Sequence, residues 1–147
     1  MPIYLVFIAL FSAGLGASYW LGFTPLLLPL ALLLLSAITY GFYAKDKAAA
    51  VAGDWRVPEN TLHLLALLGG WPGAIFGQQR LRHKTKKRSF RAVFYLTLVL
   101  NLAALAWLHS APGQQSLRQS LASVQSLARQ QLPASTLATV YYLTTLR

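Results

Sequence analysis

The most constraining feature of the sequence is a long opening stretch without charge, since its first charged residue is Lys45. Two apolar runs, residues 3–22 and 25–43, lie within this stretch and are separated by a short Gly- and Pro-containing turn. A helix of about 20 residues is roughly 30 Å long, which matches the hydrocarbon core of a bilayer. The sequence therefore predicts two transmembrane helices joined as an antiparallel hairpin.

The composition leads to the same class of protein. Hydrophobic residues make up 56% of the 147 residues and charged residues 11%, whereas soluble domains carry about 25% charged residues. Thirteen Lys and Arg against three acids indicate anionic lipid, nucleic acid, or the cytoplasmic bias of basic residues in membrane proteins. The absence of cysteine excludes disulfides and thiolate catalysis, and the sequence identifies no cofactor.

A third apolar segment, residues 59–77, contains an interruption that divides it. If it crosses the membrane, three Lys and Arg lie outside and seven inside; if it re-enters, all ten between residues 45 and 91 lie on one side. The positive-inside rule and the exclusion of broken backbone from lipid favour a re-entrant loop. The residues predicted to close this loop are Gly69, Gly70, Trp71, Pro72 and Gly73.

The rest of the chain completes the predicted fold. A basic segment precedes an apolar run at residues 92–108, and apolar residues recur at helical spacing from Leu117 to Ala128. The segment after Pro133 is predicted to be interfacial or weakly ordered. The fold class is an all-α integral membrane protein with three transmembrane helices, a re-entrant or short fourth hydrophobic segment and an amphipathic C-terminal helix. The predicted domains are a membrane domain, 1–109, and an interfacial tail, 110–147.

Four motifs in order resemble one known family. They are the YxxDKxxA pattern from Tyr43, the RxPExxL pattern from Arg56, GGWPGA from Gly69 and HKTxKxxF from His83. Together they resemble the bacterial membrane family called domain of unknown function 1294, over roughly residues 33–108. The resemblance implies a topology and a residue pattern but no established activity. Some members carry a cold-shock RNA-binding domain, which implies RNA as one class of partner.

Two carboxylates and one imidazole are the candidate catalytic residues: Asp46, Glu59 and His83. In a re-entrant loop they would converge at the membrane surface, where partial burial tunes such groups for acid–base work. Ordinary ion pairs that hold interfacial loops explain the same residues without catalysis. As a metal-ligand set these three have no support in their spacing, so no metal site is predicted.

Basic residues around them are the candidate sites for a phosphate of a lipid headgroup or small molecule. Lys84, Lys87 and Arg91 are spaced three and four apart and are expected on one helical face. The predicted anion-binding residues are Lys47, Arg56, Lys84, Lys87 and Arg91.

The sequence therefore predicts a small multi-pass protein of the bacterial inner (cytoplasmic) membrane, with residues 80–91 cytoplasmic and a phosphate-binding polar site. Whether it is an enzyme stays open. One alternative is a membrane-anchored RNA-binding protein, although only Phe90 interleaves the basic run and single-strand binders stack several aromatics. Another alternative is a non-catalytic scaffold subunit that binds a protein partner or a second copy through its tail.

Overall fold

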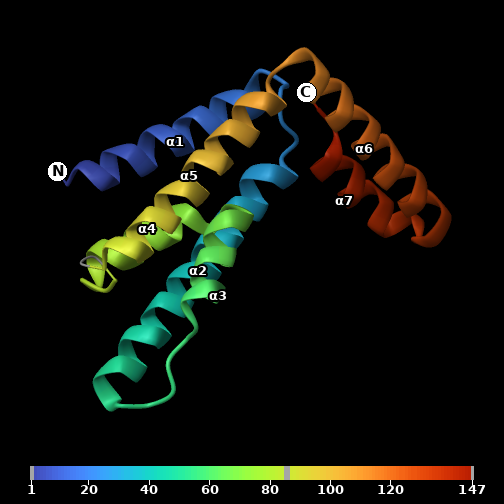
Figure 1. The fold of residues 1–147 in the computed structure, drawn as a ribbon. Coiled ribbons are helices and arrows are strands. Elements are labelled where there is room, and N and C mark those ends of the chain that lie inside the picture. The colour runs from blue at the N-terminus through green and yellow to red at the C-terminus, as the bar shows by residue number, and fades with distance from the viewer. Residues whose placement is uncertain (1, 85–86, 147) are drawn as a thin grey trace. The chain divides into compact units, whose positions relative to one another are not determined.

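The computed structural model describes residues 2–84 and 87–146, and within these ranges it is helical without strands (Figure 1). The all-α prediction is confirmed. The helices, in chain order, are α1 (Ile3–Trp20), α2 (Leu27–Ala52), α3 (Glu59–Leu65), the π-helical turn η1 (Ala66–Gly70), α4 (Trp71–Arg80), α5 (Arg88–Leu108), α6 (Ala111–Gln131) and α7 (Ala134–Thr144).

Three of these helices, α1, α2 and α5, are long and apolar enough to cross a membrane. Two of them exceed their predicted bounds. α2 continues nine residues beyond Tyr43, through an alanine-rich segment, and ends where Gly53 adopts a φ of 76°. The Asp54 amide donates to the Ala49 carbonyl at 3.0 Å, the bond of a Schellman C-cap. α5 begins at Arg88, four residues before its apolar run.

The chain forms two compact units, which are described separately. Unit 1 comprises residues 1–9 and 31–103, and unit 2 comprises residues 10–30 and 104–147.

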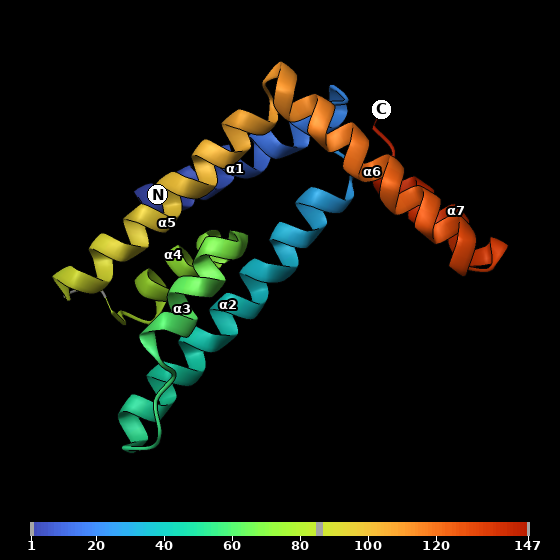
Figure 2. The same ribbon diagram turned by 45° about the vertical axis from the view of Figure 1, so that its right-hand side comes forward.

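In unit 1, α3, η1 and α4 form a helical hairpin beside α2 (Figure 2). The chain reverses at Gly69, whose φ of 113° is readily available only to glycine. Gly69 lies against Leu32 and Gly77 lies against Tyr43, so α4 runs beside α2 and parallel to it. Because the chain reverses at Gly69, α3 runs in the opposite direction to α4. Both ends of the hairpin therefore lie at the Tyr43 end of this part of α2.

The predicted loop of five residues is shorter in the structure. Only Gly69 is non-helical, while Trp71 and Pro72 begin α4, where proline suits the first helical turn. Gly73 instead allows α4 to approach α2, because a Cβ there would collide with the backbone carbonyl of Ser36. A Cβ on Gly77 would lie 2.9 Å from the Cβ of Tyr43.

The polar residue inside α5, Asn101, compensates for the break in the hairpin. Its Nδ2 donates to the carbonyls of Ala66 (3.2 Å) and Leu67 (3.0 Å) in η1. A break in the helical hydrogen-bond ladder frees carbonyls that lipid cannot satisfy, so a side-chain donor from a neighbouring helix stabilises it.

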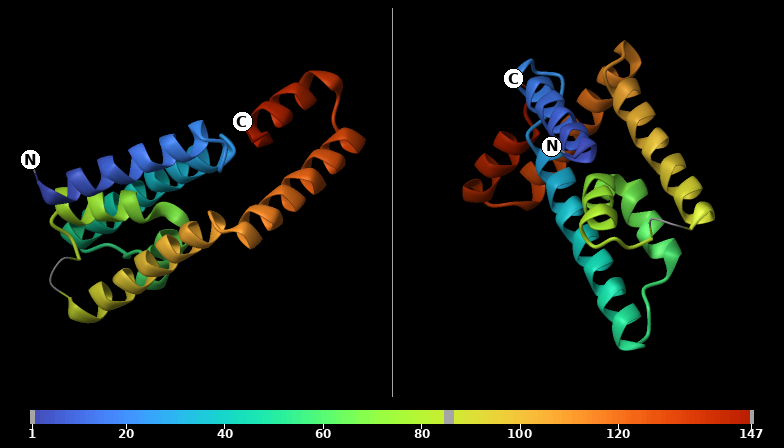
Figure 3. Two further views of the ribbon diagram at one scale, coloured as in Figure 1. Left: turned by 90° about the horizontal axis from the view of Figure 1, so that it is seen from above. Right: turned by 90° about the vertical axis from the view of Figure 1, so that its left-hand side faces the viewer.

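In unit 2, α6 and α7 form an antiparallel hairpin (Figure 3). Gln125 Nε2 donates to Thr144 Oγ1 at 3.0 Å, and Arg129 Nη2 donates to the Tyr141 hydroxyl at 2.9 Å. The amphipathic helix is present. The alternative of weak order after Pro133 missed an ordered helix, whereas the interfacial placement of this segment stays a prediction. Residues after Pro133 gain hydrogen bonds and contacts from α6 that their own composition does not reveal.

Unit 2 also contains a neutral polar cluster, which consists of Ser18, Thr24 and His109. The Ser18 hydroxyl lies 2.7 Å from His109 Nε2 and 3.1 Å from the Thr24 hydroxyl. The other ring nitrogen of His109 lies 2.7 Å from the Leu105 carbonyl. The cluster thus ties the end of α1 and the turn after it to the end of α5.

Candidate functional site

The centre of the candidate site is the carboxylate of Asp46, which is fully buried on the last part of α2. Arg56 donates from Nε to Oδ1 at 3.3 Å and from Nη2 to Oδ2 at 3.4 Å. The Val57 amide donates to Oδ1 at 3.2 Å, and His83 Nε2 lies 2.6 Å from Oδ2. Burying a carboxylate is costly unless it is paired and hydrogen-bonded, and here each oxygen has at least two partners.

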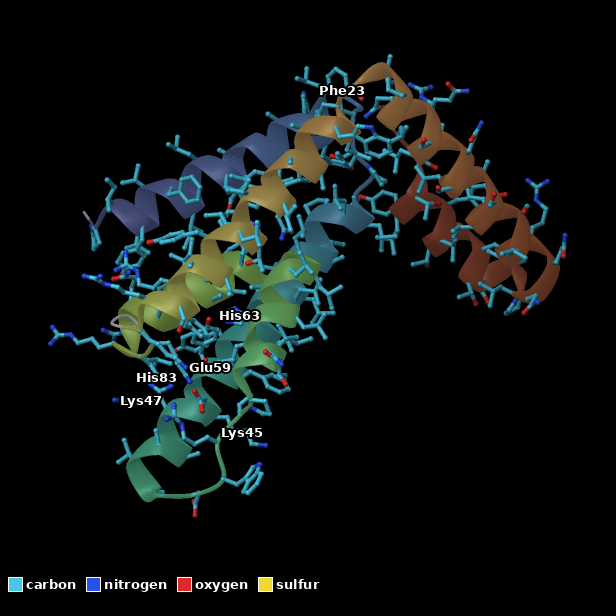
Figure 4. The ribbon with its side chains drawn as sticks, viewed as in Figure 1. Phe23, Lys45, Lys47, Glu59, His63 and His83 are labelled. Atoms are coloured by element: carbon cyan, nitrogen blue, oxygen red, sulfur yellow. The ribbon has the colours of Figure 1, made fainter. Side chains whose placement is uncertain are left out.

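A second carboxylate, that of Glu59 at the start of α3, binds two lysines. Lys84 Nζ lies 2.8 Å from Oε1 and Lys87 Nζ lies 2.7 Å from Oε2. These two hydrogen bonds lower the pKa of Glu59 to about 2. Lys84 Nζ also lies 3.6 Å from Asp46 Oδ2, so it links the two carboxylates. Figure 4 labels Glu59 and His83 where these contacts gather beside α2.

We call this set the ion-pair network; its members are Asp46, Arg56, Glu59, His83, Lys84 and Lys87. It joins α2, the loop before α3, the start of α3 and the segment between α4 and α5. The three predicted catalytic residues are therefore close together, although Glu59 reaches the other two through Lys84 rather than directly.

The backbone around His83 explains how it reaches Asp46. α4 ends in a Schellman cap, in which the His83 amide donates to the Gln78 carbonyl at 3.2 Å. Arg82 occupies the left-handed position of that cap with a φ of 49°, and Lys84 has a φ of 61°. Glycine is favoured at such positions because a Cβ adds steric cost. Thr85 and Lys86 of the basic segment lie outside the described residues.

One prediction about the basic residues is wrong. Lys84 and Arg91 do not share a helical face, because Lys84 lies in the left-handed turn before α5 begins. Arg91 instead lies in α5, where its Nη2 donates to the Tyr95 hydroxyl at 3.2 Å.

Aromatic side chains line the network. Lys84 Nζ lies 5.6 Å from the ring centroid of Phe90, and the His63 ring lies 4.3 Å from the same ring. Gln78 Nε2 donates to the hydroxyl of the fully buried Tyr43 at 3.2 Å. Nδ1 of His63 is buried and has no hydrogen-bond partner.

Both carboxylates of the network are held by internal partners. Asp46 is enclosed by donors, and Glu59 is held by two lysines. Among the residues that the structure describes, no three His, Asp or Glu side chains are grouped closely enough to hold a metal ion.

The predicted anion-binding residues fall into two groups. Arg56, Lys84 and Lys87 are paired with carboxylates inside the protein. Lys47 is half-buried, and within residues 2–84 and 87–146 it forms no hydrogen bond or ion pair. Other cations, which sequence reasoning did not single out, are exposed and equally unpaired within those ranges. These exposed cations are Lys45, Arg80, Arg82 and Arg88. Nothing in their spacing distinguishes them from the paired ones.

These features define an all-helical protein with three helices of membrane-spanning length and an ion-pair network centred on the buried Asp46. The model of a family described as "protein of unknown function (DUF1294)" matches residues 36–90, which include every member of the network. A relative, the uncharacterized protein YsdA of Bacillus subtilis (strain 168), is 38% identical over 65 residues, which cover 44% of this chain and 73% of the relative. The chain belongs to the DUF1294 family. No solved structure matches it significantly.

Proposed function

We propose that this protein is a multi-pass protein of the bacterial cytoplasmic membrane, in which the α3–α4 hairpin re-enters the bilayer from the cytoplasmic face. Support comes from the length and composition of α1, α2 and α5 and from the hairpin, whose two ends are joined to α2 by the ion-pair network. Asn101 supplies the donors that a broken helix needs in lipid.

The charge distribution supports this topology. With three spans and a re-entrant hairpin, all ten Lys and Arg between residues 45 and 91 lie on the cytoplasmic side. The same topology places the start of α1 on the cytoplasmic side and α6, with Arg118 and Arg129, on the opposite side.

On the cytoplasmic face, the exposed cations are proposed to bind phosphate-bearing headgroups of anionic lipids. The observation that carries this proposal is Arg82, an exposed arginine in a left-handed position. The two other described Schellman-type ends, after α1 and α2, have glycine at the equivalent positions, Gly22 and Gly53. An arginine at a position where glycine is less strained supports a use of its charge at the surface.

The variant Arg82→Gly tests this proposal because it separates stability from binding. Relief of the left-handed conformation is expected to stabilise the fold by about 1 kcal/mol, while loss of the cation lowers retention of phosphatidylglycerol in nanodiscs, measured by native mass spectrometry. Arg118→Gln, which removes an exposed cation from α6, is the control and is expected to leave retention unchanged. Equal retention of phosphatidylglycerol by Arg82→Gly and wild type contradicts headgroup binding. Affinity for RNA that falls steeply with salt, without retention of lipid, contradicts it as well.

A further inference from the structure

Lys84 and Lys87 have the geometry of a phosphate site that is already occupied by an internal anion. Each lysine contacts a different oxygen of the Glu59 carboxylate, at 2.8 and 2.7 Å. A carboxylate that bridges two ammonium groups presents the same pair of acceptor oxygens as a phosphate, at similar spacing.

We propose that Lys84 and Lys87 form a binding site for a phosphate monoester, and that Glu59 occupies this site until the ligand displaces it. The inference rests on the proposed function, since it assigns a ligand class to the same basic face. A phosphate monoester carries close to two negative charges at neutral pH, whereas Glu59 offers one.

Exposure around the site permits this exchange. The Lys87 side chain is 57% exposed and the Glu59 side chain 31%, so a ligand can reach them from solvent. Lys84 is only 9% exposed, and it stays in place without Glu59 because Asp46 lies 3.6 Å away and the Phe90 ring lies beside it. One lysine is therefore fixed and the other is accessible.

His63 adds a second feature of the site. It lies one helical turn after Glu59, a spacing that places both on one face of α3. Its ring contacts Phe90, as Lys84 does, and its buried Nδ1 has no hydrogen-bond partner. A buried nitrogen without a hydrogen-bond partner therefore belongs to a ring that packs on Phe90, the ring that Lys84 also contacts.

Glu59 is the single glutamate of the sequence, so its carboxylate can be observed alone. Full-length protein labelled with ¹³C-glutamate in phosphatidylcholine nanodiscs is expected to show one carboxylate resonance. Addition of phosphatidic acid is expected to shift this resonance and to move its titration toward higher pH, because both lysines transfer to the phosphate. An unchanged resonance while phosphatidic acid is bound overturns the proposal.

Variants test the competition directly. Glu59→Gln is expected to raise retention of phosphatidic acid at least about fivefold, the factor that corresponds to release of partly exposed ion pairs. Lys87→Gln in the same chain is expected to abolish the gain. The control Asp54→Asn removes an exposed acid from the loop before α3, and an equal gain in this control overturns the proposal because it shows a general charge effect.

Two further experiments distinguish a lipid headgroup from free phosphate, and failure of this inference from failure of the proposed function. Inorganic phosphate that shifts the Glu59 resonance as phosphatidic acid does assigns the site to the free ion; a shift with phosphatidic acid alone assigns it to the headgroup, and both support the two-lysine site. If Arg82→Gly lowers phosphatidylglycerol retention while Glu59 never moves, only this inference fails. If no anionic lipid is retained by wild type, the proposed function fails.

Discussion

Unit 1 and unit 2 each contain a polar cluster that ties helix ends together, but the two clusters use different chemistry. The unit 1 cluster is the ion-pair network, with two carboxylates, three Lys and Arg and one histidine. The unit 2 cluster is made of Ser18, Thr24 and His109 and contains no carboxylate. The family match at residues 36–90 covers the network and none of the unit 2 cluster.

The difference indicates what each cluster contributes. Hydrogen bonds of hydroxyls contribute about 1 kcal/mol each. A buried carboxylate is strongly destabilising once its partners are removed, so an ionic cluster makes several segments depend on one another. The four chain segments that the ion-pair network joins are therefore expected to unfold together, while loss of a unit 2 contact has a local effect.

The largest expected effect is that of Asp46→Asn. An amide at this position leaves Arg56 and His83 beside a neutral group, so the free energy of unfolding is expected to fall by about 3–5 kcal/mol. Thermal unfolding in nanodiscs measures the change. Asp54→Asn, the same substitution at an exposed position, serves as the control, and equal melting temperatures for the two variants contradict a central role for Asp46.

A smaller loss is expected when α4 is pushed away from α2. In Gly73→Ala the new Cβ meets the Ser36 carbonyl, and overpacking of this kind costs about 1–3 kcal/mol. Gly41→Ala in α2 has open space around its Cβ and is expected to stabilise the helix by about 0.5–1 kcal/mol. The two melting temperatures should move in opposite directions; a matching shift argues against close α2–α4 packing.

In unit 2, Ser18→Ala removes one neutral hydrogen bond to His109 and one to Thr24. The expected loss is about 2 kcal/mol, about 1 for each hydrogen bond, measured by the same unfolding assay. Retention of anionic lipid should stay at the wild-type level, because the exposed cations that are proposed to bind headgroups belong to unit 1. A loss as large as that of Asp46→Asn removes the distinction between the two clusters.

The smallest effect concerns pH. The pKa of Glu59 is about 2 in the folded protein against an ordinary value of 4.5, so its ion pairs stabilise the fold fully above pH 4.5. That stability is lost as the pH falls from about 4.5 to about 2. Titration of the single glutamate resonance measures this directly in the ligand-free protein. An ordinary pKa shows that the lysine contacts do not persist.

Much of the fold follows from sequence because lipid as solvent leaves few alternatives. The charge-free start and the apolar run before Trp107 predict three long helices, and the glycines near Trp71 predict a break. Helix ends were less predictable, since the apolar run stops at Tyr43, while Lys45, Asp46 and the alanines that follow could also continue the helix. α2 continues through them because Asp46 is neutralised by residues that are distant in sequence, Arg56 and His83.

The sequence predicted which acidic residues and which histidine form the candidate site, but not which cations pair with the carboxylates. Asp46, Glu59 and His83 were identified as a group, and all three belong to the ion-pair network. Which cations pair internally depends on the left-handed turn at Arg82 and Lys84. Non-glycine residues rarely adopt that conformation, so the sequence gives no signal for it.

The central claim is that the α3–α4 hairpin re-enters the membrane, so that both charged segments lie on one face. Because the chain contains no cysteine, single-cysteine variants report sidedness without background. Asp54→Cys and Ser89→Cys replace exposed residues on either side of the hairpin, and a membrane-impermeant thiol reagent is applied to oriented vesicles. We predict that both cysteines are labelled from the cytoplasmic face, and labelling from opposite faces contradicts the account.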